Sequence, residues 1–287
     1  MQKSLDIKRI QSVELEILKI TVDILEKNDI RSYLVGGTCL GAIRHKGFIP
    51  WDDDIDIGLL REDYEKARIV LMRDLPKDYL YIDNRTNPES PYNFGKVKKR
   101  GTAFVQAGDE HLDIHHGIYI DLFPFDDCAD TVEKCMKEMK TIRRYRLAAD
   151  IANMNYNKGG VLRKLSQRIL IFLGHLLLDK RRIQNKIDKL CMRHMGRHSK
   201  LVCSFLGEYL SKGIFDRNVF GEGTFVEFEN SFFRVPVKYD EYLSRVYGDY
   251  MKLPPLDKRV SPHNILFLSF DSEYKCKATV KNGNFED

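Results

Sequence analysis

The segment Trp51–Gly58, which reads WDDDIDIG, constrains this chain more than any other part of it. From Asp54 onward acid and isoleucine alternate, which predicts a β-strand with one buried and one open face. Asp54 and Asp56 would then project from the same face, roughly 6.6 Å apart along the strand. Two carboxylates held that close repel each other, and a hard divalent cation such as Mg²⁺ or Mn²⁺ would relieve the repulsion. On this segment alone, a solvated turn followed by an edge strand explains the acids equally well.

Two further motifs follow an order that favours the cation site. A short strand over 33–35 ends in Gly36 and Gly37, and a helix is expected to begin from a Thr38 cap. Glycine lacks a Cβ and lets a phosphate approach the backbone N–H groups, and a helix start favours negative charge. Much later, an apolar strand presents the single acid Asp121. A third carboxylate there would complete a metal shell or accept a proton from an attacking hydroxyl.

The pattern along the N-terminal half predicts an α+β fold. Apolar residues recur at helical spacing over 8–29 and 61–75, whereas 79–83, 94–99 and 117–122 read as strands. Strands that alternate with helices, together with neighbouring short strands, indicate a mixed β-sheet core flanked by helices. We expect this core to span residues 1–127.

The charge of the chain is unevenly distributed, which defines a second region. Residues 130–200 hold 18 Lys and Arg against 6 Asp and Glu, a net of +12, whereas the remainder has a net of −7. We expect a basic helical subdomain over 128–200 and a mixed C-terminal part over 201–287, with a possible strand at Phe225–Phe233 and a peripheral tail. A local basic field attracts phosphates, polyanions or anionic lipid surfaces.

The most apolar segment, residues 165–178, lies inside this basic region and has two interpretations. It is either a buried helix of the subdomain or an interfacial helix on an anionic membrane, and it is too short to span a bilayer. The N-terminus lacks the apolar run of a signal peptide. The six cysteines include no C-x-x-C pair and no zinc-spaced Cys/His cluster, which predicts reduced, structural thiols. We therefore expect a cytoplasmic protein, with a peripheral contact at the inner membrane face left open.

Three segments together resemble the LicD family: Tyr33–Gly58, Gly117–Asp126 and Tyr247–Pro255. That family includes lipopolysaccharide and teichoic-acid cholinephosphotransferases and is related to the fukutin-type ribitol-phosphate transferases. The order of a Gly-Gly turn, an acid-x-acid strand and a later acid also resembles the nucleotidyltransferase fold. The basic middle region resembles the family only in general character.

The resemblance implies a reaction and its participants. A phospho-alcohol group, with phosphocholine as the first expectation, would pass from a CDP-linked donor to a sugar hydroxyl of a cell-surface glycan or teichoic acid precursor, with release of CMP. Asp54 and Asp56 would be metal ligands for Mg²⁺ or Mn²⁺, and Asp121 a further ligand or the base. No nucleic-acid partner is expected. The donor phosphates would be cradled by Gly36, Gly37 and Thr38.

Several basic residues are candidates for contact with the donor phosphates or with a polyanionic acceptor. Lys96 and Lys98 alternate on an expected strand and share one face, although a solvated strand face explains them equally well. Arg44 precedes the acidic strand by a short turn, where a loop without such a contact is the equal alternative. Arg259 and His263 follow a double-proline loop, and the resemblance makes them candidates for closing the active site or binding phosphate.

Other functions remain open at this point. A nucleotidyltransferase acting on a small molecule, protein or RNA would release pyrophosphate instead of CMP. A non-catalytic protein that binds polyanions or membranes would use the basic region and show salt-sensitive binding without nucleotide turnover. A metal-dependent glycosyltransferase fits less well, since it needs neither the Gly-Gly turn nor Asp121. A choline group would need an aromatic or acidic pocket, and we choose no ligand among the aromatic residues near the motifs.

Overall fold

The computed structural model describes residues 2–153, 179–261 and 263–276, and its fold is α+β as predicted. The helices are α1 (Gln2–Lys27), α2 (Gly36–His45), α3 (Arg61–Asp74), α4 (Val132–Asn153), α6 (Lys180–Cys191) and α7 (Tyr239–Tyr247). The strands are β1 (Tyr33–Leu34), β2 (Asp56–Leu60), β3 (Tyr79–Ile82), β4 (Gly95–Lys99), β5 (Ala103–Gln106), β6 (Tyr119–Asp127), β7 (Leu201–Cys203), β8 (Ile214–Asp216), β9 (Thr224–Phe228), β10 (Ser231–Val235) and β11 (Ile265–Ser269). Short 3₁₀ turns cover Met192–His194, Leu210–Gly213, Arg217–Val219 and Leu256–Lys258.

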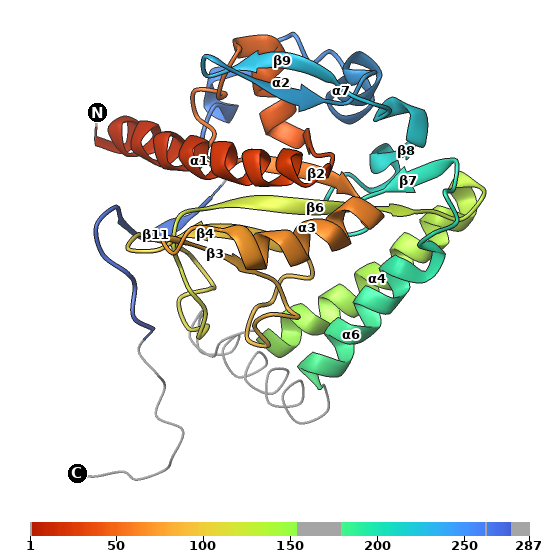
Figure 1. Cartoon of the computed structure of the whole chain (residues 1–287), viewed down its shortest axis with the longest axis horizontal. Coiled ribbons are helices and arrows are strands. Elements are labelled where there is room, and N and C mark those ends of the chain that lie inside the picture. Colours follow the sequence, from red (N-terminus) through yellow and green to blue (C-terminus); the bar gives the residue numbers. More distant parts are fainter. Residues whose placement is uncertain (1, 154–178, 262, 277–287) are drawn as a thin grey trace.

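The central sheet has the strand order β1-β2-β6-β4-β3, and β7 pairs with both β6 and β8. β2 and β6 run parallel, whereas the other neighbours are antiparallel. The helices α1 and α3 lie together on one face of this sheet (Figure 1). The apolar side of α1 packs there through Ile10, Ile17 and Leu18, which are fully buried. Each such side chain contributes roughly 1.5–3 kcal/mol by leaving water.

The helical region packs beside the sheet as a second, smaller core. α4 and α6 lie side by side (Figure 1), and Met139, Ile142 and Ile187 are buried between them and β7. The apolar segment 165–178 falls outside the described residues, so both interpretations of it stay open. Within the described part of the chain, no helix combines the length and apolarity needed to cross a bilayer.

The C-terminal part packs against the N-terminal half of the chain. β11 pairs antiparallel with β5, so residues 265–269 return to the N-terminal half. The single strand expected over Phe225–Phe233 is wrong, because the chain reverses there into the hairpin of β9 and β10. Glu229 and Asn230 form the turn, and both have positive φ, 48° and 55°. That conformation suits the tight turn of a two-residue hairpin.

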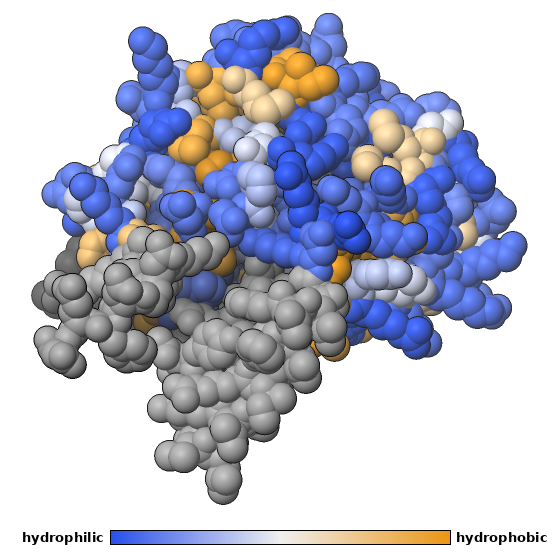
Figure 2. All heavy atoms as spheres, turned by 90° about the horizontal axis from the view of Figure 1, so that it is seen from below, coloured by the Kyte–Doolittle hydropathy of each residue, from blue (hydrophilic) through white to orange (hydrophobic). Residues whose placement is uncertain are grey.

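One face of the molecule is mainly hydrophilic over its described residues, as Figure 2 shows. The apolar residues visible on that face form separate, small patches instead of one continuous surface. Isolated exposed apolar residues are normal for a folded chain. The cavity that contains the candidate site is lined by residues of β2 and β6, among them Asp56 and Asp121.

Candidate active site

Asp54, Asp56 and Asp121 line one cavity of about 1020 Å³, together with Asp52. β2 and β6 are parallel neighbours, and their register sets Asp56 beside Asp121. The N–H of Asp121 also donates a 2.8 Å hydrogen bond to the carbonyl of Ile55. β2 begins at Asp56, so Asp54 lies two residues before the strand on which it was expected. The sheet thus brings together the three acids that the sequence proposes, while their role as ligands stays a prediction.

Gly36 and Gly37 allow the backbone to approach these carboxylates. At Gly36 φ is +56°, and an added Cβ would lie 2.8 Å from Oδ2 of Asp56. At Gly37 an added Cβ would lie 2.7 Å from Oδ2 of Asp52. Real Cβ atoms essentially never come that close to another heavy atom. Both positions line the cavity in the first turn of α2, where backbone N–H groups lack helical partners.

Thr38 has a different place from the two glycines. α2 begins at Gly36, and its N-cap residue Val35 makes no side-chain capping bond, so the expected Thr38 cap is wrong. The Oγ1 of Thr38 instead accepts a 2.8 Å hydrogen bond from the N–H of Asp56. Thr38 is buried and is not among the described residues that line the cavity. Its side chain therefore fixes the first residue of β2.

Asp52, Asp54, Asp56 and Asp121 together form what we call the acidic wall of the cavity. Burial and mutual repulsion disfavour negative charge on this wall. Burial first, and then the charge of Asp54, raises the pKa of Asp52 to about 8. Burial also raises the pKa of Asp54, against the opposing effect of His263. Burial and then the charges of Asp54 and Asp121 raise the pKa of Asp56 well above its usual range. Carboxylate oxygens with unbalanced charge are a donor set that fits Mg²⁺ or Mn²⁺.

Asp53 holds the C-terminal segment against the acidic wall. Its carboxylate accepts a hydrogen bond from Ser261 Oγ and lies 3.0 Å from Nδ1 of His263. Burial alone would lower the pKa of His263, but the bond to Asp53 and the charge of Asp54 outweigh it and raise that pKa. His263 lines the cavity. Oxygen atoms of Asp52, Asp53 and Asp54 lie within 4.8 Å of one another, so Asp53 also adds to the local negative charge.

Lys96 and Lys98 both lie on β4, but only Lys96 reaches the cavity. Each is 4% exposed, so the alternative of a solvated strand face is wrong. Nζ of Lys96 lies 2.6 Å from Oδ1 of Asp121 and 3.6 Å from the centre of the Tyr119 ring. Nζ of Lys98 donates to the carbonyl of His115, and burial followed by the charge of Lys96 lowers its pKa to about 7.

Arg44 and Arg259 are not among the described residues that line the cavity. Arg44 donates a 2.7 Å hydrogen bond from Nη1 to the carbonyl of Tyr250. Arg259 donates to the carbonyl of Pro254, and its guanidinium lies 5.6 Å from the centre of the Trp51 ring. Arg44 therefore joins α2 to the segment before the double proline, and Arg259 lies against Trp51 at the start of the acidic segment.

Glu14 of α1 is a carboxylate that the sequence reasoning missed. It is 2% exposed, and its Oε2 is buried without a hydrogen-bond partner among the described residues. Burial, followed by the charges of Asp54 and Asp53, raises the pKa of Glu14 well above its usual value. The burial of Glu14 could have been inferred from the sequence, because Glu14 lies four residues from Ile10 and from Leu18 and so falls on the apolar side of the helix.

Residues from the remaining regions complete the cavity. Tyr242 of α7 accepts a 3.0 Å hydrogen bond at its hydroxyl from the N–H of Gly36. Tyr209 and Tyr247 bond to each other through their hydroxyls at 2.7 Å. Arg146 of α4 also lines the cavity. These residues are far in sequence from the acidic segment, and the three tyrosines are more than a hundred positions away, so local sequence patterns could not identify them.

One side of the cavity is aromatic. The rings of Phe94 and Phe123 lie 4.5 Å apart between centres, and the rings of Tyr92 and Phe94 lie 5.3 Å apart. Tyr119 and Phe125 also line the cavity, whereas Trp51 is not among the described lining residues. The aromatic residues near the motifs therefore face the same space as the acids, with Trp51 as the exception.

Comparison with known proteins extends these observations. The profile of the family described as LicD/FKTN/FKRP, nucleotidyltransferase domain, matches residues 29–149. Lipopolysaccharide cholinephosphotransferase LicD of Haemophilus influenzae is 29% identical over 269 residues, 92% of this chain and 97% of that protein. Human ribitol 5-phosphate transferase FKRP is 46% identical over 48 residues, 17% of this chain and 10% of that protein. Human ribitol-5-phosphate transferase FKTN is 26% identical over 133 residues, 46% of this chain and 24% of that protein.

The matched region contains the features that carry the resemblance in the sequence. Gly36 and Gly37, Asp54 and Asp56, and Asp121 all fall within residues 29–149. The similarity to the cholinephosphotransferase extends beyond this region over nearly the whole of both chains. Residues 29–149 of this chain are therefore a domain of the LicD family.

Proposed function

We propose that the protein transfers a phospho-alcohol group, phosphocholine in the first instance, from a CDP-linked donor to a sugar hydroxyl. The acceptor would be a precursor of a cell-surface glycan such as a lipopolysaccharide or teichoic acid, and CMP would be released. The observation that carries the proposal is the convergence of Asp54, Asp56 and Asp121 with Gly36 and Gly37 on one cavity wall. The match of residues 29–149 to the LicD/FKTN/FKRP family and the similarity to a cholinephosphotransferase support the reaction type.

The acidic wall supports a metal-dependent reaction. Its oxygen donors fit Mg²⁺ or Mn²⁺, and we propose Asp54 and Asp56 as ligands, with Asp121 as a further ligand or as the base. When bound, the cation would neutralise negative charge on the donor diphosphate. Lys96 already pairs with Asp121, so its ammonium stands where a donor phosphate would approach. His263, 3.0 Å from Asp53, also lines the cavity and would add positive charge when protonated.

The start of α2 supports the binding of a phosphate. The N–H of Gly36 donates to Tyr242, and Cys39 donates the first helical bond, to the carbonyl of Val35, so the N–H groups of Gly37 and Thr38 have no helical partner. A helix N-terminus is a ready anion site, because its N–H groups and its dipole both favour negative charge. Without a side chain at Gly37, a phosphate oxygen can reach the backbone between α2 and Asp52.

The aromatic side of the cavity supports choline as the alcohol. A quaternary ammonium is attracted by aromatic faces and by nearby carboxylates. Tyr92, Phe94 and Phe123 offer such faces, while Asp109 and Asp150 add negative charge to the same cavity. A ribitol group would need hydrogen bonds in place of this aromatic surface, which is why we rank phosphocholine first.

The proposed chemical step balances without another reactant. The acceptor hydroxyl oxygen attacks the phosphorus of the phospho-alcohol group, and the bond from that phosphorus to the bridging oxygen of CMP breaks. The hydroxyl proton passes to a carboxylate, for which Asp121 is the candidate, and CMP leaves as the anion. Most of the rate would come from positioning and charge neutralisation, since the protein forms no covalent bond.

The test is an analysis of products from a panel of CDP-alcohols, with and without candidate glycans, in the presence of Mg²⁺. We expect CMP release that depends on the acceptor and is fastest with CDP-choline. Pyrophosphate release from a nucleoside triphosphate would instead establish the nucleotidyltransferase alternative. Binding of glycan or vesicles without any turnover across the panel would leave the non-catalytic alternative standing and refute the proposal.

A further inference from the structure

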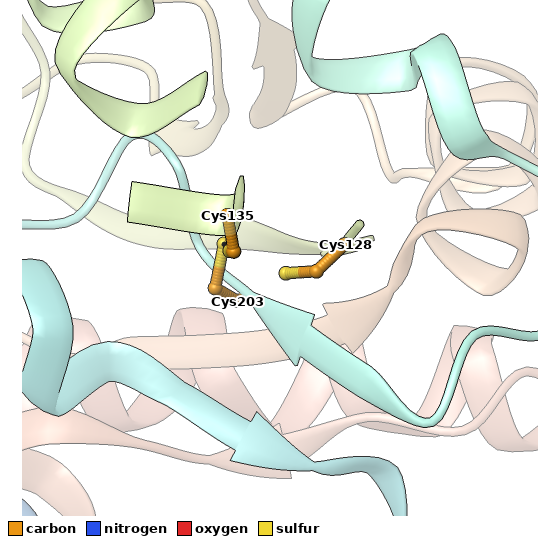
Figure 3. Close-up of side chains that lie close together, drawn as sticks. All are labelled: Cys128, Cys135 and Cys203. Atoms are coloured by element: carbon orange, nitrogen blue, oxygen red, sulfur yellow. Dashed lines mark hydrogen bonds between the residues drawn. The ribbon is translucent and has the colours of Figure 1, made fainter. Parts of the chain in front are cut away.

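Three buried cysteines from separate segments meet next to α4, and none of them lines the cavity that holds the acids. Cys128 directly follows β6, Cys135 lies in the first turn of α4, and Cys203 ends β7. Their sulfur atoms all lie within 4.8 Å of one another, and their side chains point toward a common centre (Figure 3). Each of the three residues is at most 1% exposed.

The spacing of the sulfurs agrees with a shared metal ion. Zinc–sulfur bonds are about 2.3 Å long, so two thiolates on a tetrahedral zinc lie about 3.8 Å apart. The sulfurs of Cys135 and Cys203 lie 3.9 Å apart. A disulfide needs a sulfur–sulfur distance of about 2.05 Å. The distance between the sulfurs of Cys135 and Cys203 is therefore closer to that of two ligands on one metal ion than to that of a disulfide bond. Thiolates select zinc or other soft metals over Mg²⁺.

His194 lies near Cys135 but outside the group of donor atoms within 4.8 Å of one another, so it would have to move closer to complete a metal site. Nε2 of His194 lies 2.9 Å from Oε1 of Glu138, one turn along α4 from Cys135. Its other nitrogen, Nδ1, is buried and has no hydrogen-bond partner in the described part of the chain. Histidines that bind zinc usually donate their second N–H to a carboxylate in this way. His194 and Glu138 are close enough that their charges act on Cys135.

We propose that Cys128, Cys135 and Cys203 bind one Zn²⁺ ion, for which His194 supplies the fourth ligand. The site is structural, because three protein thiolates and an imidazole leave no open position for a substrate. It is separate from the magnesium site proposed on the acidic wall, which consists only of oxygen donors. Neither proposal depends on the other, since metal content is measured without turnover.

The alternative is a group of ordinary buried thiols, since cysteine is often buried as a small apolar residue. Two observations favour the metal. Cys39 and Cys191 are equally buried but stand outside this group of close sulfurs, so burial alone does not bring cysteines together. A hollow of about 340 Å³ is lined by His194 and by Ala129 and Lys134, which are the sequence neighbours of Cys128 and Cys135.

A metal here would fix the helical region to the sheet. Cys128 and Cys203 belong to the paired ends of β6 and β7, whereas Cys135 belongs to α4. α4 contributes Arg146 and Asp150 to the large cavity. Zinc would therefore hold the wall of the cavity that faces the acids, and its removal should lower the melting temperature.

The test is the metal content of the full chain, purified under reducing conditions without chelator and measured by elemental mass spectrometry. We expect about one zinc per chain, and a fall to roughly a tenth or less in Cys203→Ala. Cys191→Ala is the matched control, because Cys191 is equally buried in the same small core but lies outside the cluster. It should keep its zinc. His194→Gln should bind zinc roughly 10–100-fold more weakly.

A second measurement on the wild-type chain avoids any folding defect of a variant. After removal of zinc, Co²⁺ should produce thiolate charge-transfer absorption and the visible bands of a tetrahedral site, and zinc should abolish both. The proposal is overturned if the wild type contains no zinc and the metal-free chain gives no such cobalt spectrum. A Cys135–Cys203 disulfide in the reduced preparation, or equal zinc content in Cys203→Ala, would overturn it as well.

Discussion

Asp52, Asp54 and Asp56 carry more negative charge than their surroundings balance, and this explains several local features. Lys96 pairs with Asp121 on the neighbouring strand, and His263 is held by Asp53. Folding without a cation therefore requires some of these acids to take up protons, since their pKa values are raised. The acidic wall should couple stability to both pH and divalent metal.

The first prediction concerns this coupling. The pKa of Asp52 is about 8 in the fold against 3.8 for the free side chain. A raised folded-state pKa stabilises at low pH, and this stabilisation is lost as pH rises from about 4 to about 8. Mg²⁺ binds the deprotonated acids, so it should raise the melting temperature more at about pH 8.5 than at about pH 5.5. Equal shifts at both pH values, or none in wild type, would contradict a cation site here.

A second prediction uses two glycines with similar backbone geometry. Gly36 (φ +56°) faces Asp56, whereas a Cβ at Gly101 (φ +69°) would meet nothing within 4 Å. Gly101→Ala should cost about 1 kcal/mol of unfolding free energy through the backbone alone. Gly36→Ala should cost more and also abolish CMP release, because its Cβ crowds the carboxylate. If the two variants lose equal stability and both stay active, close approach at Gly36 is unimportant.

Part of this residue-scale picture could be predicted from the sequence. Period-two alternation and a Gly-Gly turn are local signals, and they identified Asp54, Asp56 and Gly36 correctly as neighbours of one cavity. The side-chain partners could not be predicted in the same way. α2 begins at Gly36, two residues before the helix start that the sequence predicts at Thr38, and Glu14 lies among apolar positions of α1 where the periodicity alone does not mark a functional acid.

At the scale of elements, α7 supports the start of α2. The Tyr242 hydroxyl accepts the N–H of Gly36, and Tyr242 is 1% exposed. Tyr242→Phe should therefore leave a buried N–H unpaired and cost about 1–3 kcal/mol of unfolding free energy. Tyr250→Phe removes an exposed bond to Asp240 and should stay within about 0.5 kcal/mol of wild type. Chemical denaturation checks both, and equal losses would refute a specific role for Tyr242.

Elements with strong periodicity were the most predictable. The helix expected over 61–75 is α3, and the one expected over 8–29 overlaps α1. The segment Phe225–Phe233 was misread because its turn residues, Glu229 and Asn230, lack the glycine that usually marks a two-residue hairpin. The pairing of β11 with β5 joins segments about 160 residues apart, and such long-range pairing leaves no local pattern.

At the scale of the whole molecule, the uneven charge predicts an electrostatic surface interaction. Residues 130–200 carry a net charge of +12, while the remainder carries −7. We expect the protein to sediment with vesicles that contain anionic lipid and not with neutral vesicles, and the bound fraction should fall as salt is raised. Binding that does not respond to salt would point to apolar contact instead. The division into 1–127, 128–200 and 201–287 stays a prediction.

The central claim is that the acids on β2 and β6 perform phospho-alcohol transfer. The most direct measurement is CMP release from CDP-choline with an active acceptor and Mg²⁺, for wild type, Asp56→Asn and Asp23→Asn. Asp23 pairs with Lys27 on the exposed side of α1 and serves as the matched control. We predict a loss of roughly 100-fold or more for Asp56→Asn, with an intact fold, and wild-type turnover for Asp23→Asn. Wild-type CMP release from Asp56→Asn would contradict the account.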